Sequence, residues 1–359
     1  MLINGQYPGP TIYANAGDRI IVQFINLLGT QSTIHWHGIK QASLFLYFFF
    51  SSYSLASLSR AQSNPQFIHA LNFFLFLSLS FPFPSLTLFQ QKVTTDFEDG
   101  VGTVNQEEVP GISVGRKLSW APTAASAAAG AGKNVTAPPP PTFIYNFVVD
   151  APGSYWYHDH SLAFTYVDGL RGALIVADPW SPIVPEFPQA FNSPTIFVSD
   201  QYHQKASVLA EQYINPANSE GVEPVPKSFW INGLAGVRTP WCGGGGKQPP
   251  CRSAVINAAP LGSCSAPNTG LVFVSGAAFG FVRIHLEIAV PYRATLITVD
   301  GIPLATPRPV LMTPATPLEL QPGQRYRVAL CSDDPAAASA KPGRIVVRAP
   351  LEQFGTLGN

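Results

Sequence analysis

Two short histidine pairs are the residues of this chain best suited to chemistry. His35 and His37 form the first pair, His158 and His160 form the second, and together they are four of the seven histidines. In a β-strand, side chains at positions i and i+2 leave the same face about 6.6 to 7 Å apart, so each pair can present two imidazoles to one side of a sheet. That arrangement suits a site with more than one metal ion, although neutral imidazole binds Cu, Zn, Fe and Ni alike. The alternative is that both pairs are ordinary buried or surface histidines.

The elements that must position these histidines are expected to be strands. Thirty-five prolines and thirty glycines, with many Val, Ile, Thr and aromatic residues, favour short strands and turns over helices. Residues 143–150 alternate as a strand should, Pro152 and Gly153 form a turn before the second pair, and residues 174–177 read as a closing strand. A formal net charge of zero without a Lys/Arg cluster gives no indication of nucleic-acid or anionic membrane binding.

The residues around both pairs resemble one known family. Residues 35–39 (His-Trp-His-Gly-Ile), preceded by 4–12 (Asn-Gly-Gln-Tyr-Pro-Gly-Pro-Thr-Ile) and 17–19 (Gly-Asp-Arg), are similar to the first cupredoxin domain of the multicopper oxidases, the laccase and ascorbate oxidase superfamily. Residues 153–160 (Gly-Ser-Tyr-Trp-Tyr-His-Asp-His), followed by 168–172 (Asp-Gly-Leu-Arg-Gly), resemble the next signature of that family. The resemblance therefore implies an all-β fold and a copper cofactor.

In that family the histidines of the first domain supply half of the ligands of a trinuclear copper cluster, which reduces dioxygen to water. Carried over position by position, His35 would bind the type 2 copper. His37 and His158 would bind one type 3 copper, and His160 would bind the other.

Two acidic residues lie near these histidines in the sequence or in the family pattern. Asp99 falls where the family has an acidic residue behind the ligands, and such a carboxylate could orient the ligands and relay protons to reduced oxygen. The alternative for Asp99 is a solvated turn aspartate. Asp159 stands between the second pair, and in a continuing strand it would point to the opposite face, so we expect it at the surface.

The ligands of a blue copper site are not recognisable in the sequence. Such a site needs a Cys thiolate, two His and usually a weak axial Met, which the family places in a closing His-Cys-His motif. No cysteine here has a neighbouring histidine; the cysteines are Cys242, Cys251, Cys264 and Cys331. By the resemblance we expect half a cluster without an electron entry site, and a chain that is inactive alone. The alternative is a non-catalytic two-domain protein that binds copper or a partner.

We expect tandem cupredoxin-like Greek-key β-sandwiches, each with two antiparallel sheets packed face to face. Domain 1 would span residues 1–178 and domain 2 residues 190–359, joined by a linker at 179–189, with the family's C-terminal third domain absent. Residues 200–203, with Gln201 where laccases have Trp, and residues 320–328 extend the resemblance into domain 2. That domain carries no copper ligands in the three-domain oxidases, so His203 and His285 are expected to be structural, and Arg325 a structural ion partner.

Two insertions interrupt the expected first domain, at about 42–95 and 121–141. The first is rich in Phe, Leu and Ser, and three explanations remain: a membrane helix, which its Ser and Pro residues disfavour; a functional loop; or translated non-coding sequence such as a retained intron, which fits best. We expect it outside the β-sandwich, poorly packed or partly helical. The second, rich in Ala, Gly and Pro, is expected to be a flexible surface loop.

Compartment and partners follow mainly from the resemblance. Family members are usually exported, and residues 134–136 (Asn-Val-Thr) form a glycosylation sequon, although no signal peptide is recognisable. One disulfide is possible among Cys242, Cys251 and Cys264, whereas Cys331 lies in an apolar strand and is expected to be an inert core thiol. Completed by a third domain, the protein would use dioxygen and an unidentified reducing substrate. Substrate identity and oligomeric state stay open.

Overall fold

The computed structural model describes residues 1–40, 99–101, 106, 108–110, 140–161, 165–177, 193–235, 261–264, 269–334 and 343–350. The expected insertion at 42–95, almost all of the one at 121–141 and the expected linker at 179–189 lie outside these ranges, so those predictions are not tested. Cys242, Cys251, His69 and the sequon at 134–136 also lie outside them.

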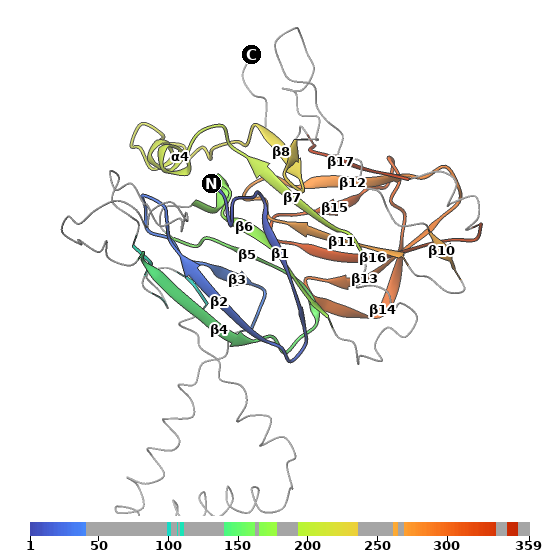
Figure 1. Cartoon of the computed structure of the whole chain (residues 1–359). Helices are drawn as coiled ribbons and strands as arrows, with labels where there is room; N and C mark the ends of the chain where they lie inside the picture. Colours follow the sequence, from blue (N-terminus) through green and yellow to red (C-terminus); the bar gives the residue numbers. More distant parts are fainter. Residues whose placement is uncertain are drawn as a thin grey trace, which may run out of the picture.

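The N-terminal part of the chain forms a β-sandwich, as expected (Figure 1). The expectation of purely antiparallel sheets is wrong, because residues 9–15 pair in parallel with residues 171–177. Four strands form one sheet in the order β1-β6-β5-β3, and two form the other, β2-β4. Their bounds are β1 Gly9–Asn15, β2 Arg19–Ile25, β3 His35–His37, β4 Thr142–Val148, β5 Gly153–His158 and β6 Arg171–Ala177. Side chains from both sheets share one apolar core, which includes Trp36, Tyr145, Phe147, Tyr157 and Leu174.

The C-terminal part forms a second β-sandwich. Its larger sheet has the order β14-β13-β16-β11-β7-β8-β9, with β10 paired to β16, and its smaller sheet has the order β15-β12-β17. The bounds are β7 Thr195–Gln201, β8 Ser228–Ile231, β9 Leu234–Ala235, β10 Gly262–Ser263, β11 Thr269–Ser275, β12 Val282–Glu287, β13 Arg293–Val299, β14 Ile302–Val310, β15 Leu318–Leu320, β16 Arg325–Ser332 and β17 Arg344–Arg348. The described part also contains helix α4, Ala206–Tyr213, and the 3-10 helix η4, Thr165–Asp168.

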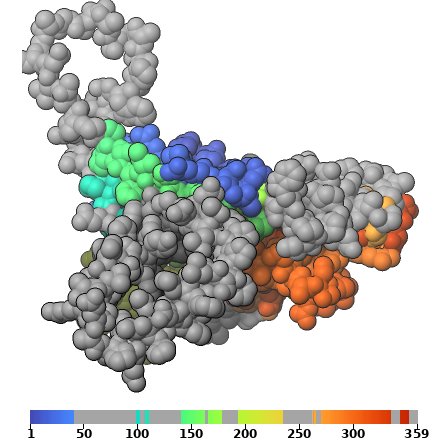
Figure 2. Space-filling model, turned by 90° about the horizontal axis from the view of Figure 1, so that it is seen from below, coloured from blue at the N-terminus to red at the C-terminus, as the bar shows by residue number. Residues whose placement is uncertain are grey.

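The two sandwiches pack directly against each other, with β5 and β6 of the first beside β7 and β11 of the second (Figure 1). In the space-filling view the blue and green first sandwich adjoins the orange second one (Figure 2). A small apolar cluster joins them, formed by Trp156, Ala173 and Ile175 from one side and Phe197, Val272 and Val274 from the other. This contact explains why every residue of β5 is buried, since one face of the strand packs on its own core and the other on the second sandwich.

The expectation that Cys331 is a free core thiol is wrong. Cys331 forms a disulfide with Cys264, with a Cα–Cα distance of 4.9 Å. The reason is the pairing of β10 with β16, which places Gly262 opposite Cys331 and so brings the cysteine two residues further on within bonding distance. The apolar pattern of β16 was read correctly as a strand, but its partner across 67 residues of sequence is not visible in that pattern.

In the parts of the chain that the structure describes, no helix combines the length and the apolar character that crossing a lipid bilayer requires.

Candidate metal centre

The first histidine pair lies on β3, the short edge strand of the four-stranded sheet, directly beside β5. β3 pairs antiparallel with β5, so that His35 is opposite His158 and His37 is opposite Trp156. The alternation of a strand sends Trp36, which is 1% exposed, into the core and both histidines of β3 to the other face. The sequence-based expectation for this pair is therefore met by the backbone.

Three imidazoles come together at this face. One ring nitrogen from each of His35, His37 and His158 lies within 4.8 Å of those of the other two. Among them, His37 Nδ1 and His158 Nε2 lie 3.4 Å apart. With metal–nitrogen bonds of about 2.0 to 2.1 Å, as in zinc sites, two nitrogens bound to one ion lie roughly 3 to 4 Å apart. The spacing therefore fits ligands that share a metal ion.

His160 lies at the rim of this group and is not one of the three. The chain leaves strand β5 after His158, and His160 is exposed. Its ring centroid is 5.3 Å from that of His35 and 5.8 Å from that of His158. The expectation of two imidazoles on one strand face thus holds for His35 and His37. It does not hold for the second pair, because β5 ends at His158 and His160 lies beyond the strand.

Hydrogen bonds fix which ring nitrogen is free on two of the histidines. His158 Nδ1 lies 2.8 Å from the carbonyl oxygen of Asp159, and His35 Nδ1 lies 2.8 Å from the carbonyl oxygen of Asp99. A carbonyl oxygen can only accept, so both Nδ1 atoms must donate, and in the neutral rings each Nε2 keeps its lone pair. This is the arrangement that a metal-binding imidazole requires.

Burial favours the uncharged form of the His37 and His158 rings. Burial, followed by the positive charge of Arg325 and the neighbouring His35, lowers the pKa of His37 to about 4. Burial also holds the pKa of His158 well below its ordinary value, and His35 acts in the same direction. A neutral imidazole is the form that binds a metal ion, so the donor set fits a divalent transition metal such as copper.

Asp99 lies beside His35 although many residues separate them in the sequence. Its Oδ1 is 3.2 Å from His35 Nδ1. Gly100 makes this approach possible: it has φ +77°, and a Cβ at this position would lie 1.9 Å from the carbonyl oxygen of Ile34. The segment at 99–100 therefore packs directly on the chain that leads into β3.

The expectation that Asp159 is a surface residue is wrong. Its side chain is fully buried, and its carboxylate accepts hydrogen bonds from Ser32 Oγ at 2.7 Å and Ser161 Oγ at 2.8 Å, among others. The expectation assumed that the strand continues through the second pair, but the strand ends at His158, so alternation no longer decides the side-chain direction. An Asp followed two residues later by Ser is a typical side-chain-to-backbone turn, and that signal could have found it.

The second sandwich closes the site without adding a histidine from its described residues. A cavity of about 450 Å³ is lined by the four histidines and by Tyr166 from η4, and its far wall includes Ala277, Pro322 and Gly323. Gly323 has φ +75°, and a Cβ there would lie 3.4 Å from Cε1 and Nε2 of His37. The resemblance at residues 320–328 does not reveal that this glycine lies against His37.

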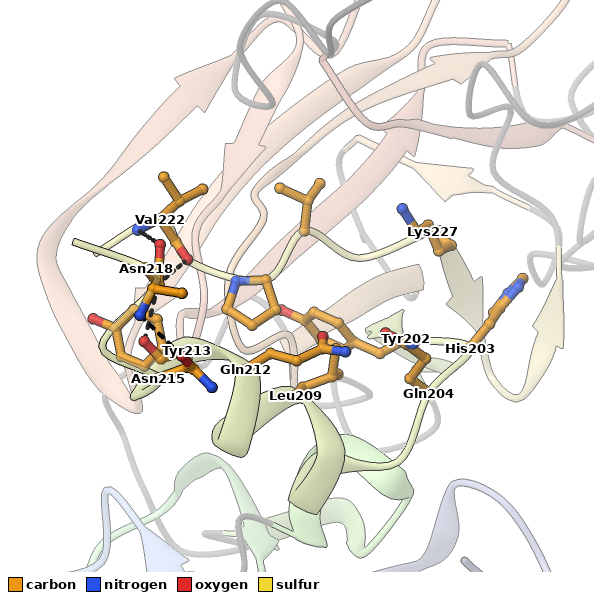
Figure 3. Close-up of a pocket in the computed structure, with 13 residues that line it drawn as sticks. Tyr202, His203, Gln204, Leu209, Gln212, Tyr213, Asn215, Asn218, Val222 and Lys227 are labelled. Atoms are coloured by element: carbon orange, nitrogen blue, oxygen red, sulfur yellow. Dashed lines mark hydrogen bonds between the residues drawn. The ribbon is translucent and has the colours of Figure 1, made fainter. Parts of the chain in front are cut away.

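The other histidines of the described part take no place in this group. His285 is buried in the second sandwich. His203 lies at one end of a separate cavity of about 620 Å³ beside α4 (Figure 3). At the other end of that cavity, the Asn218 amide donates to the carbonyl oxygens of Tyr213 and Val222. Because this amide already serves the chain's own backbone, we assign no ligand to the cavity.

Comparisons with known proteins identify sequences similar to this chain. Residues 1–45 and 124–181 match the family described as multicopper oxidase. The chain is 31% identical over 231 residues to the iron transport multicopper oxidase fetC of Epichloe festucae, which covers 64% of this chain and 24% of that protein. It is 26% identical over 359 residues to laccase-4 of Thanatephorus cucumeris, which covers 98% of this chain and 47% of that protein. The chain thus spans less than half the length of these relatives.

Solved structures show the same fold. The multicopper oxidase Fet3p, which functions in iron import, superimposes with a TM-score of 0.53 at 18% identity, covering 99% of this chain and 48% of that one. The laccase from Botrytis aclada gives 0.52 at 18% identity, covering 100% and 50%. The expected all-β, cupredoxin-like architecture is therefore confirmed.

Proposed function

Residues 1–45 and 124–181 match the multicopper oxidase family, and on that basis we propose that His35, His37, His158 and His160 bind copper as the first-domain part of a trinuclear cluster. The observation that carries the proposal is the group of three imidazoles whose ring nitrogens lie within 4.8 Å of one another. The 3.4 Å separation of His37 Nδ1 and His158 Nε2 supports a shared ion at that pair. His160, at the rim, would hold a neighbouring ion.

Copper bound here would pass electrons from a reducing substrate to dioxygen. The chain's own residues orient the ligands and handle protons. The Asp99 carbonyl oxygen accepts the proton of His35 Nδ1, and the Asp159 carbonyl oxygen accepts that of His158 Nδ1, which leaves both Nε2 atoms for the metal. The Asp99 carboxylate, 3.2 Å from His35 Nδ1 and partly open to solvent, is proposed to relay protons between solvent and the site.

The four histidines are half of the ligand set that a trinuclear cluster uses in the family. We propose that this chain acts as the N-terminal portion of an oxidase, with domain 1 at residues 1–178 and domain 2 at 190–359, and that a thiolate copper site and the remaining ligands come from a third domain. A non-catalytic copper-binding role is the second candidate. The disulfide between Cys264 and Cys331 is compatible with both candidates, because neither of these two sulfurs is free to form a blue copper site.

We also propose that the protein works outside the cell. Stable disulfides form in oxidising compartments and are rare in the cytosol, and Cys264 and Cys331 are paired. The sequon at residues 134–136 is consistent with export.

Copper titration beside oxygen uptake tests the function. We expect the parent chain to bind Cu²⁺ and the double variant His37→Ala/His158→Ala to lose most of that affinity. The matched control is His203→Ala, which removes an exposed histidine from outside the group and should bind copper like the parent. With a phenol or ascorbate as reductant, the chain alone should consume no oxygen beyond free copper. Copper affinity unaffected by the double variant would contradict the assignment, and steady oxygen consumption would contradict the need for a third domain.

A further inference from the structure

A fully buried carboxylate lies between the two segments that carry the histidines. Asp159 is 0% exposed, and burying a carboxylate is costly unless hydrogen bonds satisfy both oxygens. Both oxygens are satisfied here, and all of the donors belong to the two histidine-bearing segments. The Asp159 carboxylate therefore does more than stabilise a local turn, because it links both histidine-bearing segments.

Each oxygen of Asp159 serves a different segment. Oδ1 accepts from Ser32 Oγ at 2.7 Å and from the Thr33 backbone N–H at 3.2 Å, directly before strand β3. Oδ2 accepts from Ser161 Oγ at 2.8 Å, from the Ser161 N–H at 3.3 Å and from the Thr165 N–H at 3.0 Å, directly after the second histidine pair. One carboxylate therefore joins chain segments that are 127 residues apart in sequence.

The backbone of the same residue is fixed as well. The Asp159 N–H donates to the carbonyl oxygen of Leu170 at 2.9 Å, and the Asp159 carbonyl oxygen accepts the Nδ1 proton of His158 at 2.8 Å. The side chain thus holds in place the peptide group that decides which ring nitrogen of His158 is free. Loss of the carboxylate would weaken the hold on this peptide group and on Ser32 and Thr33, which lead into β3.

We propose that Asp159 is a positioning residue for the copper site: its carboxylate sets the separation and orientation of the two histidine-bearing segments, so that imidazoles from both can bind the same metal ions. This inference rests on the proposed function. It assigns a role to a residue that contacts no metal itself.

The chemistry of the carboxylate defines the best variant. Asp159→Asn keeps the shape of the side chain but has one acceptor oxygen and one NH₂ donor. In either orientation of the amide, its NH₂ donor faces groups that donate to the carboxylate in the parent. These groups belong to Ser32 and Thr33 on one side and to Ser161 and Thr165 on the other. Residues behind metal ligands typically change metal affinity by about 10- to 100-fold when mutated, and we expect a loss in that range for Cu²⁺.

The experiment measures Cu²⁺ affinity, the electron paramagnetic resonance spectrum of the bound Cu²⁺ and the thermal unfolding of the metal-free chain. Asp159→Asn should weaken binding and change the spectrum, and Ser32→Ala, which removes one tie to the strand lead-in, should do so to a smaller extent. Val328→Ala serves as control because it opens the fully buried core of the second sandwich. It should lower the unfolding temperature with copper affinity and spectrum unchanged.

The possible outcomes separate the two proposals. Parent-like affinity and spectrum in Asp159→Asn would overturn this inference alone, and so would an equal affinity loss in Val328→Ala, because the effect would then follow overall stability. A parent chain that binds copper no better than His37→Ala/His158→Ala would overturn the proposed function and this inference with it. If Asp159→Asn does not fold, Ser32→Ala and Ser161→Ala decide: weakened copper binding supports the role, and unchanged binding in both overturns it.

Discussion

Arg325 of the second sandwich donates its Nε hydrogen to the backbone carbonyl oxygen of Ser154 in the first, over 2.8 Å. Its other nitrogens donate to the carbonyl oxygens of Gly323 at 2.9 Å and Asp300 at 3.0 Å. Ser154 lies on β5, the strand that ends in His158, and Gly323 faces His37. One guanidinium therefore connects the turn at Gly323 with the strand that carries His158, a proposed copper ligand.

Replacing this guanidinium should weaken the joint between the sandwiches. Arg325→Lys leaves a single ammonium that cannot reach all three carbonyl oxygens, so we expect a loss of about 2 to 3 kcal/mol in the free energy of unfolding, measured by urea denaturation. Arg293→Lys is the matched control because its ion pair with Asp333 is exposed, and about 0 to 1 kcal/mol is expected there. Equal effects of the two variants would contradict the role of Arg325.

Replacing Gly100 by alanine should lower the free energy of unfolding more than the same change at a glycine with a similar backbone conformation and no neighbouring atoms. Gly100→Ala would place a Cβ 1.9 Å from the Ile34 carbonyl oxygen, whereas Gly17, also at positive φ, has nothing within 4 Å of its Cβ position. We expect Gly17→Ala to cost about 1 to 2 kcal/mol from the backbone conformation alone, and Gly100→Ala to cost roughly 2 kcal/mol more from the clash. Urea denaturation of both variants gives the comparison. Similar costs would mean that the segment carrying Asp99 does not pack on β3 as described.

The disulfide should contribute measurably to stability. Cys264 and Cys331 close a loop of 67 residues, so their replacement in Cys264→Ser/Cys331→Ser should lower the free energy of unfolding by about 2 to 4 kcal/mol. Chemical denaturation measures this loss, and mass mapping of the non-reduced parent identifies the linked peptides. Recovery of either cysteine as a free thiol in the native parent would contradict the pairing.

His285 should make the metal-free protein less stable at mildly acidic pH. Burial, assisted by the charge of Arg348, lowers its pKa below the ordinary 6.5, against the opposing effect of Glu287. His285 therefore takes up a proton at about pH 6.5 in the unfolded chain, but only at lower pH in the folded chain. The stability that neutral His285 contributes is present above about pH 6.5. It is lost as the pH falls below that value. Between pH 7 and 5, unfolding midpoints should fall less steeply for His285→Gln than for the parent. Parallel slopes would show that His285 titrates normally in the folded state.

The strand placement of His35 and His37 could be predicted from the sequence because it depends only on local alternation, and the β3–β5 register confirms it. The cupredoxin-like fold was predictable for a similar reason, since its motifs are short and continuous. The burial of Asp159 was not predictable, because the end of β5 at His158 is set by the turn that follows. A one-residue change in where a strand ends reverses the expected side-chain direction.

Features that depend on packing between distant segments could not be predicted from the sequence either. The Cys264–Cys331 disulfide follows from the pairing of β10 with β16, and the closure of the site by Gly323 follows from the docking of one sandwich on the other. Neither leaves a periodic signal in the sequence. The two insertions and the domain boundaries stay predictions.

The most direct test of the central claim is a count of imidazole nitrogens bound to Cu²⁺, by pulsed electron paramagnetic resonance on the parent loaded with substoichiometric copper. We predict coupling to at least two imidazole rings, because His37 Nδ1 and His158 Nε2 lie 3.4 Å apart. That signal should be lost in His37→Ala/His158→Ala and kept in His203→Ala. A spectrum without imidazole coupling, or one that the double variant leaves unchanged, would show that these histidines do not form a copper site.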